Sequence, residues 1–218
     1  MTFEQIRSNP DVKTYITKAD EALSALGYTE HSFAHVTKVA EDAARILECL
    51  GYDAHTVELA RIAGYMHDIG NLVNRVDHSQ SGAVMAFRIL DNLGMSAEDI
   101  STVVSAIGNH DEGTGVPVNS VAAALIIADK CDVRRTRVRN TDQLSFDIHD
   151  RVNYSVVGSE LDIRPRDGRV TLKLTVDSGI SAVMEYFQIF IGRMQMSRAA
   201  AEALGLTFGL VINGQVLL

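Results

Sequence analysis

A histidine and an aspartate stand side by side at the end of a long apolar segment of this sequence. The segment covers residues 57–70 and closes with His67 and Asp68 in the order H-D-I-G. A helix that is apolar on most sides is buried in a protein core. An ionised carboxylate in such surroundings needs a shifted pKa, an ion pair or a metal ion. The setting of His67 and Asp68 therefore favours a metal site.

Two further His-Asp pairs show that the dipeptide alone is weak evidence. The pair His149-Asp150 lies at the edge of a region that alternates like β-strands, with no apolar helix to bury it. We interpret it as a chance pair and expect His149→Ala to change nothing. In the other pair, His110 follows Ile107 by three residues, on the apolar side of a helix predicted to start at Ser96.

Three more side chains take inward positions on other predicted helices. His35 lies at the edge of the inner face of a helix over 32–50, and His78 directly precedes a helix over 79–93. Asp129 lies on the inner face of a very apolar helix over 120–133. Imidazole and carboxylate ligands without thiolates suit iron, manganese, cobalt, nickel or zinc and disfavour a structural zinc site. The candidate ligands are His35, His67, Asp68, His78, His110 and Asp129.

The elements that must position these ligands are mostly helices. Apolar residues recur at helical spacing through the first 150 residues, and strand-like alternation begins only at residue 151. We therefore predict a mainly α fold, with a helical domain over 1–150 and a small α+β extension over 151–218 that packs on it. The predicted elements of the extension are strands over 151–164 and 169–176, a helix over 180–204, and one or two strands with a turn at Asn213-Gly214.

Composition and net charge narrow the range of functions that this protein can have. The 218 residues carry a net charge of −8, which argues against binding nucleic acid polymers. The N-terminus lacks the apolar core of a signal peptide and the longest clean apolar run, 121–128, is too short to span a bilayer, so we expect a cytoplasmic protein without membrane contact. The two cysteines, Cys49 and Cys131, are widely spaced and are expected to be core residues.

Arginines gather directly after the predicted Asp129 helix. Arg134, Arg135, Arg137 and Arg139 crowd one short segment of an otherwise acidic chain. Guanidinium groups suit phosphate oxygens because they donate paired hydrogen bonds. We predict that Arg134 and Arg135 bind an anionic substrate, and that His31, one helical turn before His35, contacts the substrate or supports a ligand.

The ligand order H…HD…H…H…D resembles the HD-domain superfamily of metal-dependent phosphohydrolases, over roughly 32–135. His67-Asp68-Ile69-Gly70 resembles the signature of that superfamily, and H-S-Q-S-G from His78 is similar to an element of its dinuclear branches. The resemblance implies a helical bundle with two divalent ions, iron or manganese before nickel, cobalt, zinc or magnesium. It also implies that His35, His67, Asp68 and Asp129 bind one ion, whereas His78 and His110 bind a second ion bridged by Asp68.

The same resemblance implies a reaction. Two cations about 3.5–4 Å apart can lower the pKa of a water and hold a phosphoryl group for in-line attack, so a phosphoester or phosphoanhydride of a small metabolite or nucleotide is the expected substrate. A cyclic dinucleotide is disfavoured, because Asn71, Asn109 and Val116 depart from the HD-GYP pattern, whereas Ala128-Asp129-Lys130 is similar to dinucleoside tetraphosphate hydrolases.

Two other classes share this ligand order. The diiron oxygenases that act on phosphonates or polyols use the same order and are the second interpretation, and a non-catalytic nucleotide-binding module is the third. The apolar side of the helix over 180–204 faces either the core or a partner in a homodimer.

Overall fold

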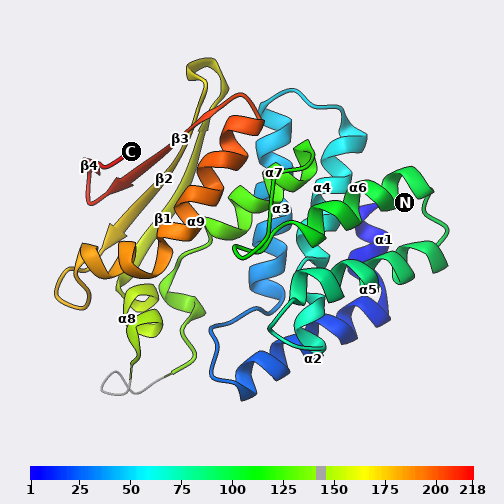
Figure 1. Cartoon of the computed structure of the whole chain (residues 1–218), viewed down its shortest axis with the longest axis horizontal. Helices are drawn as coiled ribbons and strands as arrows, with labels where there is room; N and C mark the ends of the chain where they lie inside the picture. Colours follow the sequence, from blue (N-terminus) through cyan, green and yellow to red (C-terminus); the bar gives the residue numbers. More distant parts are fainter. Residues whose placement is uncertain (141–145) are drawn as a thin grey trace.

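Three helices that pack on one another form the centre of the molecule: α3 (Phe33–Cys49), α4 (Ala54–Met66) and α7 (Ser120–Lys130). The structure, a computed structural model, describes residues 1–140 and 146–218. Helices make up one side and a small sheet lies against the other, next to α9 (Figure 1). The remaining helices are α1 (Phe3–Ser8), α2 (Pro10–Ala25), α5 (His78–Asn92), α6 (Ala97–Gly108), α8 (Ile148–Ser155) and α9 (Val183–Ala203), with 3₁₀ turns η1 (Ile69–Leu72), η2 (Arg135–Arg137) and η4 (Pro165–Asp167).

Small residues allow the central helices to approach closely. A Cβ added at Gly64 of α4 would lie 2.7 Å from the Cα of Ala40 on α3, so only glycine permits this crossing. Helix α7 is buried from Val121 to Ala128, and Asn119 starts it by accepting a hydrogen bond from the Ala122 amide. The ends of α3, α4 and α7 are thereby fixed relative to one another.

The sheet follows the order β1-β2-β3-β4 and mixes both strand directions. The pairs β1–β2 and β3–β4 are antiparallel, whereas β2 and β3 are parallel and are connected through α9. The expected turn at Asn213-Gly214 is confirmed, with both residues at positive φ. The strands are β1 (Val156–Arg164), β2 (Arg169–Val176), β3 (Thr207–Ile212) and β4 (Gln215–Val216).

The apolar core is continuous across the two regions predicted from the sequence. Phe190 and Met194 of α9 and Leu172 of β2 belong to the same buried cluster as the central helices. The mainly helical fold with a small C-terminal sheet is confirmed. Residues 1–150 and 151–218, which the sequence predicts as a helical domain and its extension, therefore share one core.

Some element predictions were wrong in detail. Residues 151–155, predicted to be a strand, continue helix α8, because Asp147 caps its first turn by accepting from the Asp150 amide. Helix α4 ends at Met66, so His67 is its C-cap and Asp68 lies beyond it. Cys49, expected in the core, is exposed, whereas Cys131 is buried.

Candidate metal centre

The six predicted ligands lie together because each comes from the end of a helix. His35 is in the first turn of α3, His78 is the first residue of α5, and Asp129 is in the last turn of α7. His67 and Asp68 follow α4 and His110 follows α6. The four imidazoles and Asp68 are almost completely buried, and Asp129 is 12% exposed.

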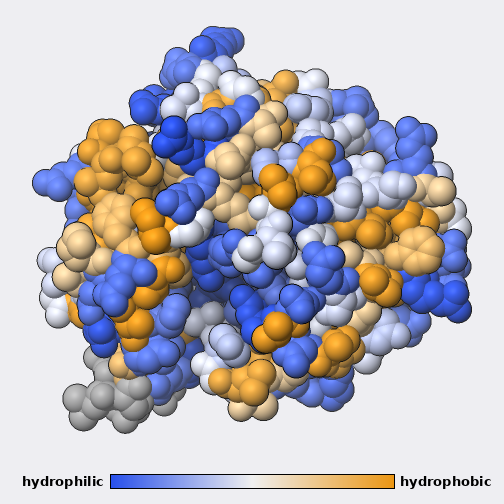
Figure 2. All heavy atoms as spheres, viewed as in Figure 1, coloured by the Kyte–Doolittle hydropathy of each residue, from blue (hydrophilic) through white to orange (hydrophobic). Residues whose placement is uncertain are grey.

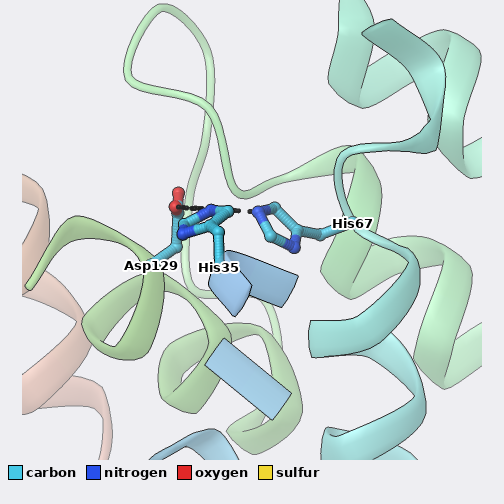
Figure 3. Close-up of side chains that lie close together, drawn as sticks. All are labelled: His35, His67 and Asp129. Atoms are coloured by element: carbon cyan, nitrogen blue, oxygen red, sulfur yellow. Dashed lines mark ion pairs between the residues drawn. The ribbon is translucent and has the colours of Figure 1, made fainter. Parts of the chain in front are cut away.

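The first ligand group consists of His35, His67 and Asp129 together with one oxygen of Asp68. His35 Nε2 lies 3.4 Å from Asp129 Oδ1 and 3.5 Å from Asp68 Oδ2. His67 Nε2 lies 3.6 Å and 3.2 Å from the same two oxygens. Figure 3 shows the two imidazoles and the carboxylate of Asp129 pointing toward one another from separate segments.

The second ligand group consists of His78 and His110 together with the other oxygen of Asp68. Asp68 Oδ1 lies 3.5 Å from His78 Nε2 and 4.0 Å from His110 Nε2, and the two imidazole nitrogens are 3.2 Å apart. Asp111 Oδ1 is 3.9 Å from His78 Nε2. Asp68 thus stands between the two groups, with one oxygen toward each.

Hydrogen bonds at Nδ1 fix the orientation of all four imidazoles. The partner is a carboxylate oxygen for His35 and a backbone carbonyl for the other three, and these groups only accept. Each Nδ1 therefore donates, which directs a free Nε2 lone pair into the site, as in metal-binding histidines. The acceptors are Asp132 Oδ2 for His35, Gly64 O for His67, Arg75 O for His78 and Ile107 O for His110, at 2.6–3.1 Å.

Unpartnered polar atoms show that these residues fit a cation. His35 Nε2, His67 Nε2 and Asp68 Oδ2 are buried and have no hydrogen-bond partner within the described residues. A buried lone pair without a partner is costly. Two sets, His35–His67–Asp129 and His67–Asp68–His110, each bring three ligand atoms within 4.8 Å of one another, so the described residues can hold a divalent metal.

Electrostatics in the site favour positive charge. Burial lowers the pKa of His67, but the carboxylates of Asp68 and Asp129 outweigh burial and raise it to about 10. Burial raises the pKa of Asp68, yet His67 and His35 hold it well below its usual range. Two carboxylates that remain ionised in the interior attract a proton or a metal ion, and the two compete for the same imidazole lone pair.

Comparison with known proteins identifies this arrangement. Residues 32–134 match the family model of the HD domain. Residues 32–134 thus resemble an HD domain. This match agrees with the resemblance that the sequence indicated over roughly 32–135, and the matched residues include all six candidate ligands.

Comparison of the sequence and of the fold found similar proteins. The chain is 26% identical over 212 residues to the uncharacterized protein MJ1020 of Methanocaldococcus jannaschii, covering 85% of this chain and 80% of the relative. Among solved structures, a predicted HD superfamily hydrolase from an uncultured Thermotogales bacterium has 24% identity and a TM-score of 0.46, covering 57% of this chain and 67% of that chain.

Asp132 supports His35 in the candidate site, and the sequence analysis missed it. It is buried and accepts from His35 Nδ1 and, at 2.8 Å, from Arg134 Nε. Burial raises the pKa of Asp132, but His35 and Arg137 outweigh this and keep the carboxyl ionised. Its spacing of three residues from Asp129, about one helical turn, is the signal that could have revealed it.

A cavity of about 370 Å³ adjoins the candidate metal centre. Arg75, Arg137 and Arg193 line it together with His31, whose ring packs edge-on against His35. Figure 2 shows hydrophilic residues around a hollow on the face shared with Figure 1. The cavity therefore brings guanidinium groups from three distant parts of the chain close to the candidate ligands.

The arginines predicted to bind substrate lie elsewhere. Arg134 bonds to Asp132, Thr136 and Glu30, and Arg135 stacks on the Tyr154 ring and donates to the Tyr154 carbonyl. Neither lines the cavity, whereas His31 does.

The interpretation of His149 also changes. This residue lies on helix α8, not at the edge of a strand, and it lines the cavity with Asp147 and Asp150. A substitution of His149 is consequently not a neutral control.

None of the helices in the described part of the chain is both long and apolar enough to cross a membrane.

Proposed function

We propose that this protein is a metal-dependent phosphohydrolase that acts on a small phosphorylated metabolite or nucleotide. The position of Asp68 carries the proposal, since its two oxygens face two different pairs of buried imidazoles. This arrangement suits two divalent ions that share one carboxylate. Imidazole and carboxylate ligands favour iron or manganese, with nickel, cobalt, zinc or magnesium as alternatives.

Bound cations would supply Lewis acidity at this place, because they lower the pKa of water and neutralise the charge of a phosphoryl group. The HD domain's own residues orient the ligand atoms and exclude bulk water. His35 and His67 are held by their Nδ1 bonds and keep their Nε2 atoms directed inward. The burial of this site excludes bulk water, which strengthens each electrostatic interaction in it.

The cavity supports an anionic substrate. Arg137 is buried, and its hydrogen bonds to Glu30 O and Asp132 O fix its guanidinium at the cavity wall. The Arg193 guanidinium lies over the Phe190 ring, 4.6 Å from its centre, and also lines the cavity. These two arginines and Arg75 are suited to hold phosphate oxygens.

The cavity lining also carries negative charge. Asp147 and Asp150 of the α8 end line the cavity, beside Asn153. Carboxylates and amides accept hydrogen bonds from hydroxyl groups. A phosphate ester of a sugar, polyol or nucleoside would place its phosphate at the arginines and its hydroxyl groups at these residues.

Metal analysis and an assay on the same preparation test the proposal. Elemental analysis should find iron or manganese in the purified protein, and phosphate release from a panel of phosphoesters and nucleotides should be equal with and without oxygen. Oxygen uptake with a phosphonate or polyol would instead indicate an oxygenase. Nucleotide binding without turnover would indicate a binding module. Either of these results would overturn the proposal.

Asp68→Ala should remove metal and activity together, because the substitution deletes the carboxylate shared by both groups. His55→Ala is the matched control, since the His55 side chain is 62% exposed and pairs only with Asp99 in the described structure. Asp68→Asn, which keeps the side-chain volume, separates metal loss from misfolding when circular dichroism shows a native spectrum. Full metal content in Asp68→Ala would contradict the whole ligand assignment.

A further inference from the structure

The two ligand groups around Asp68 differ in their other contacts. In the first group, His35 Nε2, His67 Nε2 and Asp68 Oδ2 have no hydrogen-bond partner within the described residues. In the second group, Asp68 Oδ1 accepts from Asn71 Nδ2 at 2.9 Å. Arg75 Nη1 lies 3.4 Å from His78 Nε2. Two side chains of the protein, Asn71 and Arg75, thus already contact the second group, each at one of its ligand atoms.

Lys130 is a cationic side chain near the first group, and it contacts an oxygen of Asp129 that the imidazoles do not face. Lys130 Nζ is 2.7 Å from Asp129 Oδ2, whereas the imidazoles of His35 and His67 face the other oxygen of Asp129. The lysine therefore leaves the inward atoms of the first group free. Other side chains therefore contact inward-facing atoms of the second group but not those of the first.

Arg75 and a metal ion compete for the same lone pair. His78 Nδ1 donates to the Arg75 carbonyl, so His78 Nε2 carries the lone pair that faces the guanidinium. The guanidinium remains charged at any ordinary pH. A divalent ion could not bind His78 Nε2 while that lone pair accepts from Arg75, and the positive charge of the guanidinium would repel the ion.

We propose that the HD domain binds two metal ions unequally: tightly in the first group, and in the second group only when Arg75 moves away from His78. The inference rests on the metal site of the proposed function but not on its reaction. Arg75 is then a positioning residue that controls the number of ions in the site.

The cavity offers Arg75 an alternative partner. Arg75 lines the cavity beside Arg137 and Arg193, and its guanidinium lies 5.7 Å from the centre of the Tyr28 ring. An anion among these three arginines would attract Arg75 away from His78. An anionic ligand should therefore strengthen binding at the second group, and the second ion should strengthen binding of the anion by the same factor.

Calorimetric titration of the metal-free full chain with Mn²⁺, with and without inorganic phosphate, tests this proposal. Arg75→Met removes the charge while keeping an unbranched side chain. Arg88→Met is the matched control, because Arg88 is an exposed arginine on the neighbouring α5. Circular dichroism and the tight-binding class report whether each variant is folded.

The wild-type chain should show one tight and one weak class of Mn²⁺ sites. Arg75→Met should strengthen the weak class by roughly tenfold or more, the range typical of residues that contact metal ligands, and should leave the tight class unchanged. Phosphate should strengthen the weak class in the wild type and in Arg88→Met but not in Arg75→Met.

Three results would overturn the proposal: two equal classes in the wild type, no stronger weak class in Arg75→Met, or the same phosphate effect in that variant. The proposed function fails in a different way, since a chain loaded with two Mn²⁺ ions that releases no phosphate would disprove the reaction while leaving the unequal binding intact.

Discussion

At the scale of single residues, the candidate metal site depends on groups outside the six candidate ligands. Asp132 orients His35 through its Nδ1–H and stabilises Arg134 by an ion pair. A carboxylate that accepts from a ligating histidine fixes its tautomer and makes its other nitrogen a better ligand. We therefore expect the affinity of the first ligand group for a metal ion to depend on Asp132, which contacts His35 from outside the group.

Asp132→Asn should weaken Mn²⁺ binding at the first group by roughly 10–100-fold, because the amide carries no charge to polarise His35. Calorimetric titration measures this change. Asp167→Asn, on the exposed η4 turn, is the control and should bind as the wild type does. Unchanged affinity in Asp132→Asn would show that His35 needs no carboxylate behind it.

The two cysteines should differ sharply in reactivity. Burial raises the pKa of the Cys131 thiol to about 12, whereas Cys49 is exposed. Because the thiolate is the reactive form, a disulfide reagent at pH 8 should modify Cys49 rapidly in the native protein and Cys131 only after unfolding. Rapid modification that persists in Cys49→Ser would contradict this assignment.

At the scale of elements, the second ligand group depends on how closely η1 packs against α5. A Cβ at Gly70 would collide with the His78 carbonyl oxygen and the Gly82 amide nitrogen. Both contacts are with backbone, which cannot rotate away as a side chain can. Gly70 thus holds Asp68, at the start of η1, beside His78, at the start of α5.

Gly70→Ala should lower the free energy of unfolding by about 2 kcal/mol or more and should impair Mn²⁺ binding at the second group more than at the first. Thermal unfolding and calorimetric titration measure the two effects. Gly192→Ala on α9 meets open space and should be neutral or stabilising by up to about 1 kcal/mol. Similar stability of the two variants would mean that η1 can shift without cost.

At the scale of the whole molecule, the C-terminal region completes both the core and the cavity. Tyr186, Phe190 and Met194 of α9 are buried in the cluster that includes α7. Arg193 of the same helix lines the cavity and contacts Glu112 at 2.9 Å, on the loop after α6. The residues outside the HD domain match therefore contribute to the apolar core and to the lining of the cavity.

A chain that ends at residue 150 should not unfold cooperatively, because it would expose the apolar surface that α9 covers on α7. Circular dichroism during heating tests this expectation, with the full chain as the reference. A truncated chain that melts cooperatively within a few degrees of the full chain would show that residues 1–150 fold independently.

The homodimer also stays a prediction, which size-exclusion chromatography can check.

Charge placement shows why part of the site escaped sequence reading. The arginine cluster after Asp129 was expected to act through Arg134 and Arg135, but helix α7 ends at Lys130 and the chain turns through η2. This turn buries Arg137 at the cavity and directs Arg135 to Tyr154. Which arginine faces inward depends on a local turn for which periodicity gives no signal.

The sequence by itself predicted the candidate metal ligands as a set and the helices that carry them, because a buried histidine or aspartate needs an apolar helix around it and leaves a periodic pattern. The resemblance to the HD domain came from the order and motifs of these residues. Only the tertiary structure decided how the two oxygens of Asp68 divide between the groups, that Arg75 contacts His78, and that Arg193 and α8 complete the cavity. These relations join residues far apart in the chain, and their geometry follows from how the helix ends meet in the folded core.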